Sequence, residues 1–315
     1  MKQPAKESKE SQVLETVTDY TRFYELPAPA HPLLTLIDLR PFSSAPAGPN
    51  RPELLDPVVL GLYTVFLKRN LNGPLYYGHH TYDFREGVMG FSAPGQIFRV
   101  AKELDTSRLS GWMLVFHPDL LRHHPLAQKI AGYGFFAYDV HEALHLSAPE
   151  EALLDTLLLG LRQEYERPID AFSQDVLVAQ LEVLLHYANR FYHRQFLTRR
   201  TAGHDLLNRF EALLANYFTP DSARPLPTVR HFADELHVSV AYLSDLLRTL
   251  THQNAQQHIH HALIERAKHL LLSTNLTISE TAFRLGFDYP QYFSRLFKRK
   301  TGRSPAAFRT EGWLQ

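Results

Sequence analysis

Residues 278–309, ISETAFRLGFDYPQYFSRLFKRKTGRSPAAFR, predict a helix, a tight turn and a second helix. Thr277, followed three residues later by Glu280, forms a capping box that begins the first helix. Gly286 supplies the positive φ that the turn requires, because glycine has no Cβ to oppose it. Asp288 is expected to cap the second helix. The stretch therefore predicts a helix-turn-helix unit.

The second of these helices, expected from about Tyr289 to Lys300, has two different faces. One face is apolar and is expected to be buried, with Phe293, Leu296 and Phe297. The other face is wholly polar, with residues spaced three or four apart: Gln291, Ser294, Arg295 and Lys298. Such a helix can enter the major groove of DNA, where Gln and Arg reach base edges and Lys or Arg hold phosphates.

The same unit occurs a second time upstream. Residues 232–239, FADELHVS, align with residues 281–288, TAFRLGFD, and after one inserted residue the match continues from Leu243 to Arg248. One such pattern alone is equally typical of a plain helical hairpin. Two copies beside a basic cluster favour DNA binding instead.

The positive charge of the chain is concentrated in its C-terminal third. Thirty-three basic residues balance 33 acidic ones over the whole chain. Residues 200–315 nevertheless carry a net charge of +4, and residues 1–199 carry −4. Seven basic residues and one acid lie between Arg284 and Arg309. A solvated face would usually mix the two signs, so attraction to phosphates explains this excess better.

The C-terminal stretch resembles the signature of the AraC/XylS family of bacterial transcription regulators. The residues that carry the resemblance are Ala282, Gly286, Phe287, Tyr292, Phe293, Arg295, Phe297, Lys298, Gly302, Ser304, Pro305 and Arg309. Residues 236–251, LHVSVAYLSDLLRTLT, and 263–272, LIERAKHLLL, resemble the family's first helix-turn-helix and its connecting helix. The resemblance implies that the connecting helix, roughly Ala255 to Leu272, holds two recognition helices for successive major grooves about 34 Å apart.

The outward residues of both recognition helices are the expected DNA contacts: Ala241, Tyr242, Ser244, Asp245, Arg248, Tyr289, Pro290, Gln291, Ser294, Arg295, Lys298 and Arg299. Three positions depart from the family pattern. His237 and His252 stand where glycine is usual, which puts the turn geometry in question, although histidine tolerates positive φ. Asp245 stands where a basic or neutral residue is common, so it either accepts a hydrogen bond from cytosine or pairs with Arg248. Pairing is favoured, because phosphates repel an unpaired carboxylate.

The N-terminal half has the texture of β-strands. Its short apolar or alternating runs are broken by Gly, Pro and Asn: LLTLIDL, VVLGLYTVFL, PLYYGHHTYDF, GVMGFSA, QIFRVA and GWMLVF. Asn72-Gly73 and Pro94-Gly95 predict turns between such runs. Five or six strands indicate a small jelly-roll sandwich or barrel. The region resembles the cupin-type sensor domain of many family members, which implies a small-molecule effector; a barrel that serves only as a dimerisation scaffold is the alternative.

Helical periodicity begins after Pro149. Residues 170–195 carry an apolar seam at alternating spacings of four and three: Leu177, Leu181, Leu184, Ala188 and Phe191. Such a seam is typical of a short coiled coil and predicts a homodimer interface. A helix that packs on its own barrel would show the same pattern, so both alternatives stay open.

These patterns predict a multi-domain chain of α and β structure, with a jelly-roll or cupin-like N-terminal barrel, flanking helices and an all-α C-terminal domain. The expected segments are a disordered tail at 1–12, a cupin-like sensor domain at 13–170, a dimerisation helix at 171–197, a linker at 198–202 and a double helix-turn-helix domain at 203–315.

A metal-dependent cupin-type enzyme is the alternative from another functional class. His79, His80 and Glu86 would be its ligands, but adjacent strand positions point to opposite faces, so imidazoles at 79 and 80 do not converge on one ion. The chain has no cysteine, which excludes a thiolate nucleophile and Cys-ligated zinc. It also lacks phosphate-binding and nucleophile-elbow motifs, so no catalysis and no cofactor are expected.

No apolar run approaches the roughly 20 residues that span a membrane, and the N-terminus is polar. We therefore expect a cytoplasmic, sequence-specific transcription regulator. Its expected partners are double-stranded DNA, a second copy of the chain, RNA polymerase and a small-molecule effector, without a membrane. By the resemblance alone, an activator is favoured over a repressor.

Overall fold

The computed structural model describes residues 12–40, 58–70, 87–98, 108–139, 142–198, 200–218 and 225–312. The chain divides into two compact units, Met1–Gln195 and Phe196–Gln315. All described strands belong to the first unit, and the described residues of the second are helical apart from their connections. This confirms the predicted change from a β-rich to an all-helical region. Within the described residues, every helix is too short or too polar to cross a membrane.

Two sheets form the centre of the first unit. The five-stranded sheet has the order β2 (Leu34–Asp38), β7 (Ser110–Phe116), β4 (Tyr63–Arg69), β5 (Val88–Ser92) and β8 (Leu144–His145), and all neighbours are antiparallel. The three-stranded sheet has the order β1 (Gln12–Leu14), β3 (Val58–Leu60) and β6 (Gln96–Phe98). Leu14 and Leu60 of the smaller sheet share one apolar core with Ile37, Val88 and Val115 of the larger sheet. The two sheets therefore pack face to face.

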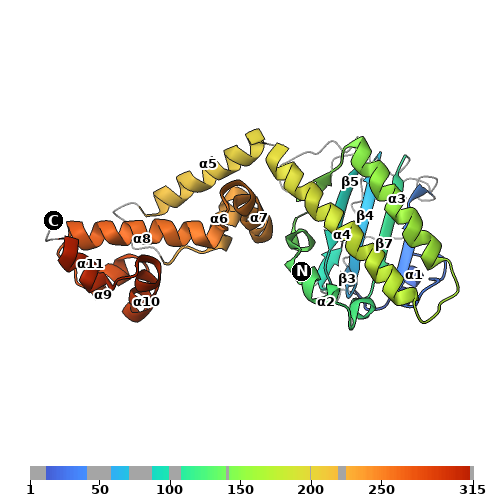
Figure 1. The fold of residues 1–315 in the computed structure, drawn as a ribbon, viewed down its shortest axis with the longest axis horizontal. Helices are drawn as coiled ribbons and strands as arrows, with labels where there is room; N and C mark the ends of the chain where they lie inside the picture. The colour runs from blue at the N-terminus through green and yellow to red at the C-terminus, as the bar shows by residue number, and fades with distance from the viewer. Residues whose placement is uncertain are drawn as a thin grey trace, which may run out of the picture. The chain divides into compact units, whose positions relative to one another are not determined.

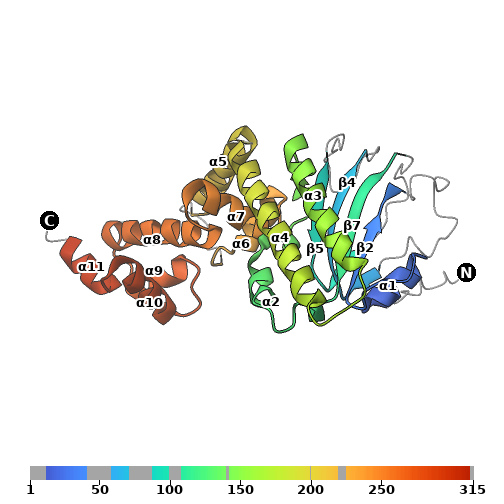
Figure 2. The same cartoon turned by 45° about the vertical axis from the view of Figure 1, so that its right-hand side comes forward.

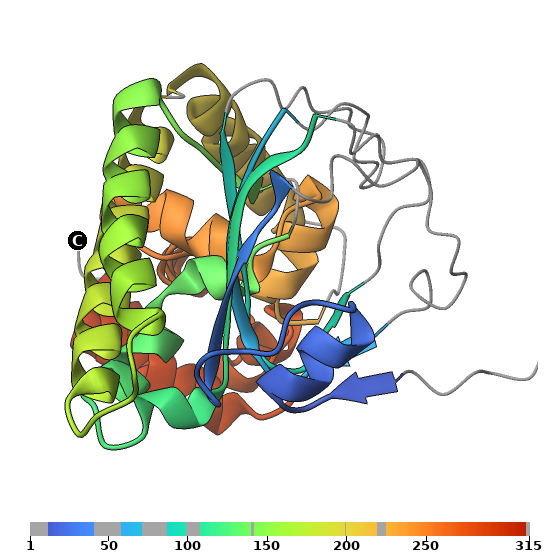
Figure 3. The same ribbon diagram turned by 90° about the vertical axis from the view of Figure 1, so that its right-hand side faces the viewer.

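The long helices α3 and α4 cover the opposite face of the five-stranded sheet, which Figure 3 shows along its edge. Successive side chains of a strand point to opposite faces, and Arg69 of β4 points towards α3. Its guanidinium donates hydrogen bonds to Glu151 (2.5 Å) and Asp155 (2.7 Å). Phe91 of β5 lies against Tyr192 of α4, with 6.2 Å between ring centroids. The helices of this unit are α1 (Val17–Phe23), α2 (Leu126–Lys129), α3 (Ala148–Tyr165) and α4 (Ser173–Thr198), with short 3-10 turns at Pro118–Leu121, Ile130–Gly132 and Gly134–Ala137.

Most of the apolar runs are strands where they were predicted. The run PLYYGHHTYDF and its Asn72-Gly73 turn lie outside the described residues. Residues 1–11 of the expected disordered tail lie outside the described residues, and its last residue, Gln12, begins β1 and pairs with Val58. Strand β1 has only three residues, too few for a sequence pattern to reveal it.

The apolar seam of α4 is buried by its own chain. Its five side chains, Leu177, Leu181, Leu184, Ala188 and Phe191, are at most 7% exposed. The structure thus agrees with the alternative in which the helix packs on its own domain, and these five residues leave no surface for a partner subunit. The same helix exposes Val176 and Val183 on its outer side.

The second unit consists of helices packed around two apolar cores. These helices are α5 (Arg200–Tyr217), α6 (Val229–Leu236), α7 (Val240–Thr251), α8 (Ala255–Ser273), α9 (Ile278–Arg284), α10 (Pro290–Thr301) and α11 (Pro305–Gly312). Because α5 begins at Arg200, most of the linker expected at 198–202 is helical.

Helix α8 joins the two cores. Ile259 belongs to the core shared with α5, α6 and α7, whereas Leu263 and Ala267 belong to the core shared with α9 and α10. Figures 1 and 2 show α6 and α7 beside one end of α8, and α9, α10 and α11 beside the other. The helix predicted for residues 255–272 is therefore present as α8, and its two halves contribute to the two cores.

Candidate nucleic-acid interface

The two helix pairs, α6 with α7 and α9 with α10, turn in the same way. His237 after α6 has φ 57°, and Gly286, its equivalent after α9, has φ 88°. The ends of the second helices match as well, with φ 61° at His252 and 77° at Gly302. Both histidines thus adopt the left-handed conformation that glycine adopts in the other copy. The departures from the family pattern do not change the turn geometry.

Helix α9 begins with the predicted capping box, whereas α10 is not capped by the residue that was predicted. Thr277 and Glu280 form the predicted capping box: the Glu280 N–H donates to the Thr277 hydroxyl (3.1 Å), and the Thr277 N–H donates to the Glu280 carboxylate (2.7 Å). Asp288 does not cap α10, because the residue before that helix is Tyr289, whose side chain makes no capping bond. Pro290 occupies the first turn instead, where its missing N–H costs nothing.

Substitutions at the equivalent left-handed positions Gly302 and His252 are expected to change the free energy of unfolding in opposite directions. A Cβ at Gly302 would meet no atom within 4 Å, so Gly302→Ala introduces backbone strain without a clash. We expect it to lower the free energy of unfolding of the second unit by about 1 kcal/mol, and His252→Gly to raise it by about 0.5 kcal/mol. Urea unfolding of the full chain, followed by circular dichroism, measures both. A loss of stability in His252→Gly would contradict this explanation.

Helix α10 presents the predicted polar face to solvent. Phe293 and Phe297 are fully buried, which fixes the rotation of the helix. Within α10, four of the expected contact residues are exposed, namely Gln291, Arg295, Lys298 and Arg299, and Ser294 is partly buried. The guanidinium of Arg295 lies 5.8 Å from the ring centroid of Tyr292. The Arg295 side chain therefore lies beside the Tyr292 ring and remains exposed to solvent.

Two tyrosines stand at the start of α10. Tyr289 and Tyr292 are 57% and 55% exposed, and their rings meet edge to face at 5.8 Å. Tyr289 was among the expected contacts, whereas Tyr292 was noted only as part of the family signature. Exposed aromatic rings beside Arg295 can make apolar contacts with thymine methyl groups or sugars.

Helix α7 offers a less basic face. Ala241, Tyr242, Ser244 and Asp245 are partly buried, and Arg248 is exposed. The Arg248 guanidinium donates to the Asp245 carboxylate at 2.7 Å. The predicted pairing is confirmed, so the carboxylate of Asp245 is engaged by a neighbouring residue on its own helix.

One basic residue of the C-terminal cluster has a structural role. Arg309 of α11 donates to the main-chain carbonyl of Leu271 at 3.0 Å, and this bond ties α11 to the end of α8. An arginine whose side chain is bonded in this way is less available to bind a phosphate than its charge suggests. Charge counting could not reveal this, because the contact joins residues 38 positions apart.

Histidines are frequent along α8, and two have ring environments that the sequence did not indicate. The ring of His258 lies 2.8 Å from the Thr251 hydroxyl at the end of α7. Burial lowers the pKa of His260, and the positive charges of Lys300 and Arg299 lower it further. The basic end of α10 therefore faces α8, and a neutral His260 avoids adding to that charge.

The three residues considered for a metal site, His79, His80 and Glu86, lie outside the described residues. Among the described residues, no three His, Cys, Asp or Glu side chains come together as a metal site. His117 caps the turn that begins at Pro118, and His124 lies 3.2 Å from Asp175.

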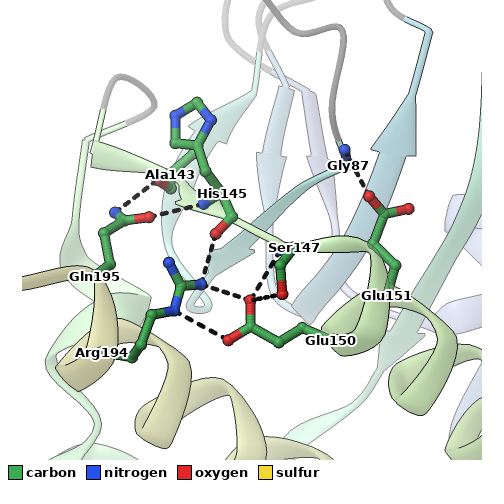
Figure 4. A network of polar contacts seen from close by, with 8 residues as sticks. All are labelled: Gly87, Ala143, His145, Ser147, Glu150, Glu151, Arg194 and Gln195. Carbon is green, nitrogen blue, oxygen red and sulfur yellow. Dashed lines mark hydrogen bonds and ion pairs between the residues drawn. The ribbon is translucent and has the colours of Figure 1, made fainter. Parts of the chain in front are cut away.

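A polar network fixes the last turns of α4 to the first unit (Figure 4). Arg194 donates to the His145 carbonyl (2.9 Å) and to the Glu150 carboxylate (2.6 Å). Gln195 accepts from the His145 N–H (2.9 Å) and donates to the Ala143 carbonyl (3.3 Å). Strand β8 is therefore bonded to the helix that leads out of the first unit, and nothing in the local sequence indicated this connection.

Comparison with known proteins agrees with the geometry of the second unit. A family model described as a helix-turn-helix domain matches residues 232–311. The chain is 26% identical over 262 residues to YfiF, an uncharacterized HTH-type transcriptional regulator of Bacillus subtilis, and the match covers 76% of this chain and 74% of that protein. It is 32% identical over 203 residues to the HTH-type transcriptional activator RhaR of Enterobacter sp., covering 62% of this chain and 67% of that protein.

Other relatives are matched over a shorter part of the chain. Several curated regulators align with the chain over less than a third of their own length. Among solved structures, the C-terminal domain of AraT, a response regulator from Geobacillus stearothermophilus, is 31% identical with a TM-score of 0.31, and the match covers 34% of this chain and 84% of that one.

Proposed function

The chain belongs to the AraC/XylS family of transcription regulators, and from this premise we propose that α7 and α10 are its two recognition helices on operator DNA. The protein is a DNA-binding regulator, as its relatives are. The observation that carries the proposal is the repeated helix, left-handed turn and helix, which places α7 and α10 in equivalent positions on either side of α8. Two helix-turn-helix units joined in this way suit successive major grooves on one face of the duplex.

The two helix pairs of the second unit contribute unequally in this proposal. Helix α10 and the turn after it carry Arg295, Lys298, Arg299, Lys300 and Arg303, and all five are exposed. Helix α7 carries one arginine, which is paired with Asp245. The helix pair α9 and α10 would therefore supply most of the phosphate attraction, with Gln291, Ser294 and Arg295 facing base edges. The helix pair α6 and α7 would read bases with Ala241, Tyr242 and Ser244.

The first unit is proposed to be a cupin-type sensor barrel that binds a small-molecule effector. The support is its pair of facing sheets with a shared apolar core. Activation is favoured because RhaR is named an activator, and such activation would act on RNA polymerase in the cytoplasm. A homodimer is proposed as well, formed by surfaces other than the buried seam of α4. The outer residues Val176 and Val183 are available for it.

Salt dependence tests the DNA-binding proposal. Releasing counterions from each neutralised phosphate gives a slope of about −0.9 in log K against log[salt]. If four or five of the exposed cations of the second unit meet phosphates, the slope for the full chain is about −4. Titration of a labelled duplex between low and physiological salt measures it. A flat dependence would remove the electrostatic basis of the proposal.

A further inference from the structure

His260 lies in the part of α8 where the helix passes from one core of the second unit to the other. Ile259 belongs to the core shared with α6 and α7, whereas Leu263 and Ile264 belong to the core shared with α9 and α10. Residues four apart lie on the same face of a helix. His260 is therefore one turn before Ile264 on the side of α8 that packs against α9 and α10, and its side chain is partly buried there.

The basic end of α10 lies next to this histidine. Phe297 of α10 is fully buried in the same core as Ile264. Arg299 and Lys300 follow Phe297 by two and three residues and are exposed. Burial lowers the pKa of His260, and the charges of Lys300 and Arg299 lower it further. The ring is therefore neutral at neutral pH in the chain without DNA.

The other charged groups on this part of α8 do not offset the two cations. Glu265 forms an ion pair with Lys268, whose Nζ lies 2.7 Å from the carboxylate. His261 is exposed, and its positive charge acts on the ring of His258. Among the described residues of α8 and its neighbouring helices, the charges that act on His260 are the two cations of α10.

Gln256 is the hydrogen-bonding neighbour of the ring on α8. It is exposed one turn before His260, and its amide nitrogen lies 2.9 Å from Nε2 of the ring. The amide can donate to Nε2 only while the ring is neutral. A protonated imidazole has two N–H donors and no acceptor, so protonation ends this bond and creates a donor that requires a new acceptor.

A bound duplex would supply both the acceptor and the opposite charge. Figures 1 and 2 show α8 between α7 at one end and α10 at the other. When these two helices occupy successive major grooves, the DNA backbone between the grooves lies opposite α8. A phosphate there is attracted by Lys300 and accepts hydrogen bonds from N–H groups. An anion within about 4–6 Å favours the protonated form of a histidine.

We propose that His260 is a proton-dependent ligand of the DNA backbone, which binds one phosphate together with Lys300 and the amide of Gln256. This rests on the proposed roles of α7 and α10 and extends the interface to the helix between them. The ligand is a phosphodiester of the duplex, and its binding takes up a proton at His260.

The proton uptake fixes the direction of the pH dependence. A bound phosphate raises the pKa of His260 above its value in the chain without DNA. At alkaline pH the ring is neutral in both states and contributes no gain. DNA affinity rises as the pH falls through the two pKa values, and the gain is complete below them, where the ring is protonated in both states.

Titration of a labelled duplex with the full chain, at about pH 8 and about pH 5.5, tests the proposal. The duplex is one recovered by selection from a random-sequence pool. We expect the affinity of the unaltered chain to gain about five- to tenfold more between these pH values than that of His260→Gln. At pH 8 the two proteins should bind alike. His261→Gln, which removes the exposed neighbouring histidine, should keep the full gain.

An equal pH dependence of His260→Gln and the unaltered chain overturns the proposal. Circular dichroism checks that the variants fold. Should His260→Gln not fold, nuclear magnetic resonance of the histidine ring protons gives the pKa of His260 in the unaltered chain. The duplex must raise this pKa, and inorganic phosphate at the same ionic strength must not; any other result contradicts the site. Binding at pH 8 without the gain refutes this site alone, whereas a chain that binds no duplex at either pH refutes the proposed function as well.

Discussion

Replacing Leu181 and Leu184 with aspartate together is expected to unfold the first unit. Both side chains are at most 1% exposed within their own chain, so the carboxylates would be buried without partners. Each such burial costs several kcal/mol beyond the lost apolar contacts. The sum is comparable with the whole stability of a domain, which is about 5–15 kcal/mol. Circular dichroism should show the loss of the strands and helices of this unit.

The matched control is Val176→Asp with Val183→Asp on the same helix. These side chains are 36% and 42% exposed, so the double variant should remain folded. Analytical ultracentrifugation of this control also shows whether the outer side of α4 holds a second copy. A folded monomer from the Leu181 and Leu184 variant would contradict the packing described here and restore the dimer seam.

Arg295→Ala is expected to relax base preference at one or two adjacent base pairs. Arg295 is exposed on the polar face of α10, beside Tyr292, and its guanidinium can contact guanine with two parallel hydrogen bonds. Losing such a contact costs about 1–3 kcal/mol of discrimination, or roughly 5- to 150-fold between the preferred and the substituted base. Affinities for a bound duplex and its single-base variants measure this effect.

Lys300→Ala is the control for Arg295→Ala. Lys300 is exposed near the end of α10, next to α8, where it is suited to a phosphate rather than a base. It should weaken binding to all sequences alike and make the salt slope shallower by about 1. If Arg295→Ala also lowers every affinity by the same factor, Arg295 contacts only the phosphate backbone.

The second unit was largely predictable because its information is local. Capping boxes, a glycine turn and a two-faced helix are patterns within a few residues, and the repeat of the pattern showed that two copies exist. The pairing of Asp245 with Arg248 follows from their spacing on one helix turn. The role of Arg309 could not be predicted, because its carbonyl partner is set by the tertiary packing of α11 on α8.

For the first unit, the sequence predicted where most of the strands lie but not how α4 packs. Strand runs were visible, but the seam of α4 was ambiguous, because a helix on a sheet and a helix in a coiled coil bury the same spacing of leucines.

Selection of bound duplexes from a random-sequence DNA pool, with the full chain, tests the central claim most directly. If α7 and α10 read successive major grooves, the enriched sequences contain two conserved blocks whose centres lie about 10 base pairs apart. The block assigned to α10 by the Arg295→Ala comparison should be the more strictly conserved of the two. A pool without any enriched motif, or a single block with no second at that spacing, would contradict the account.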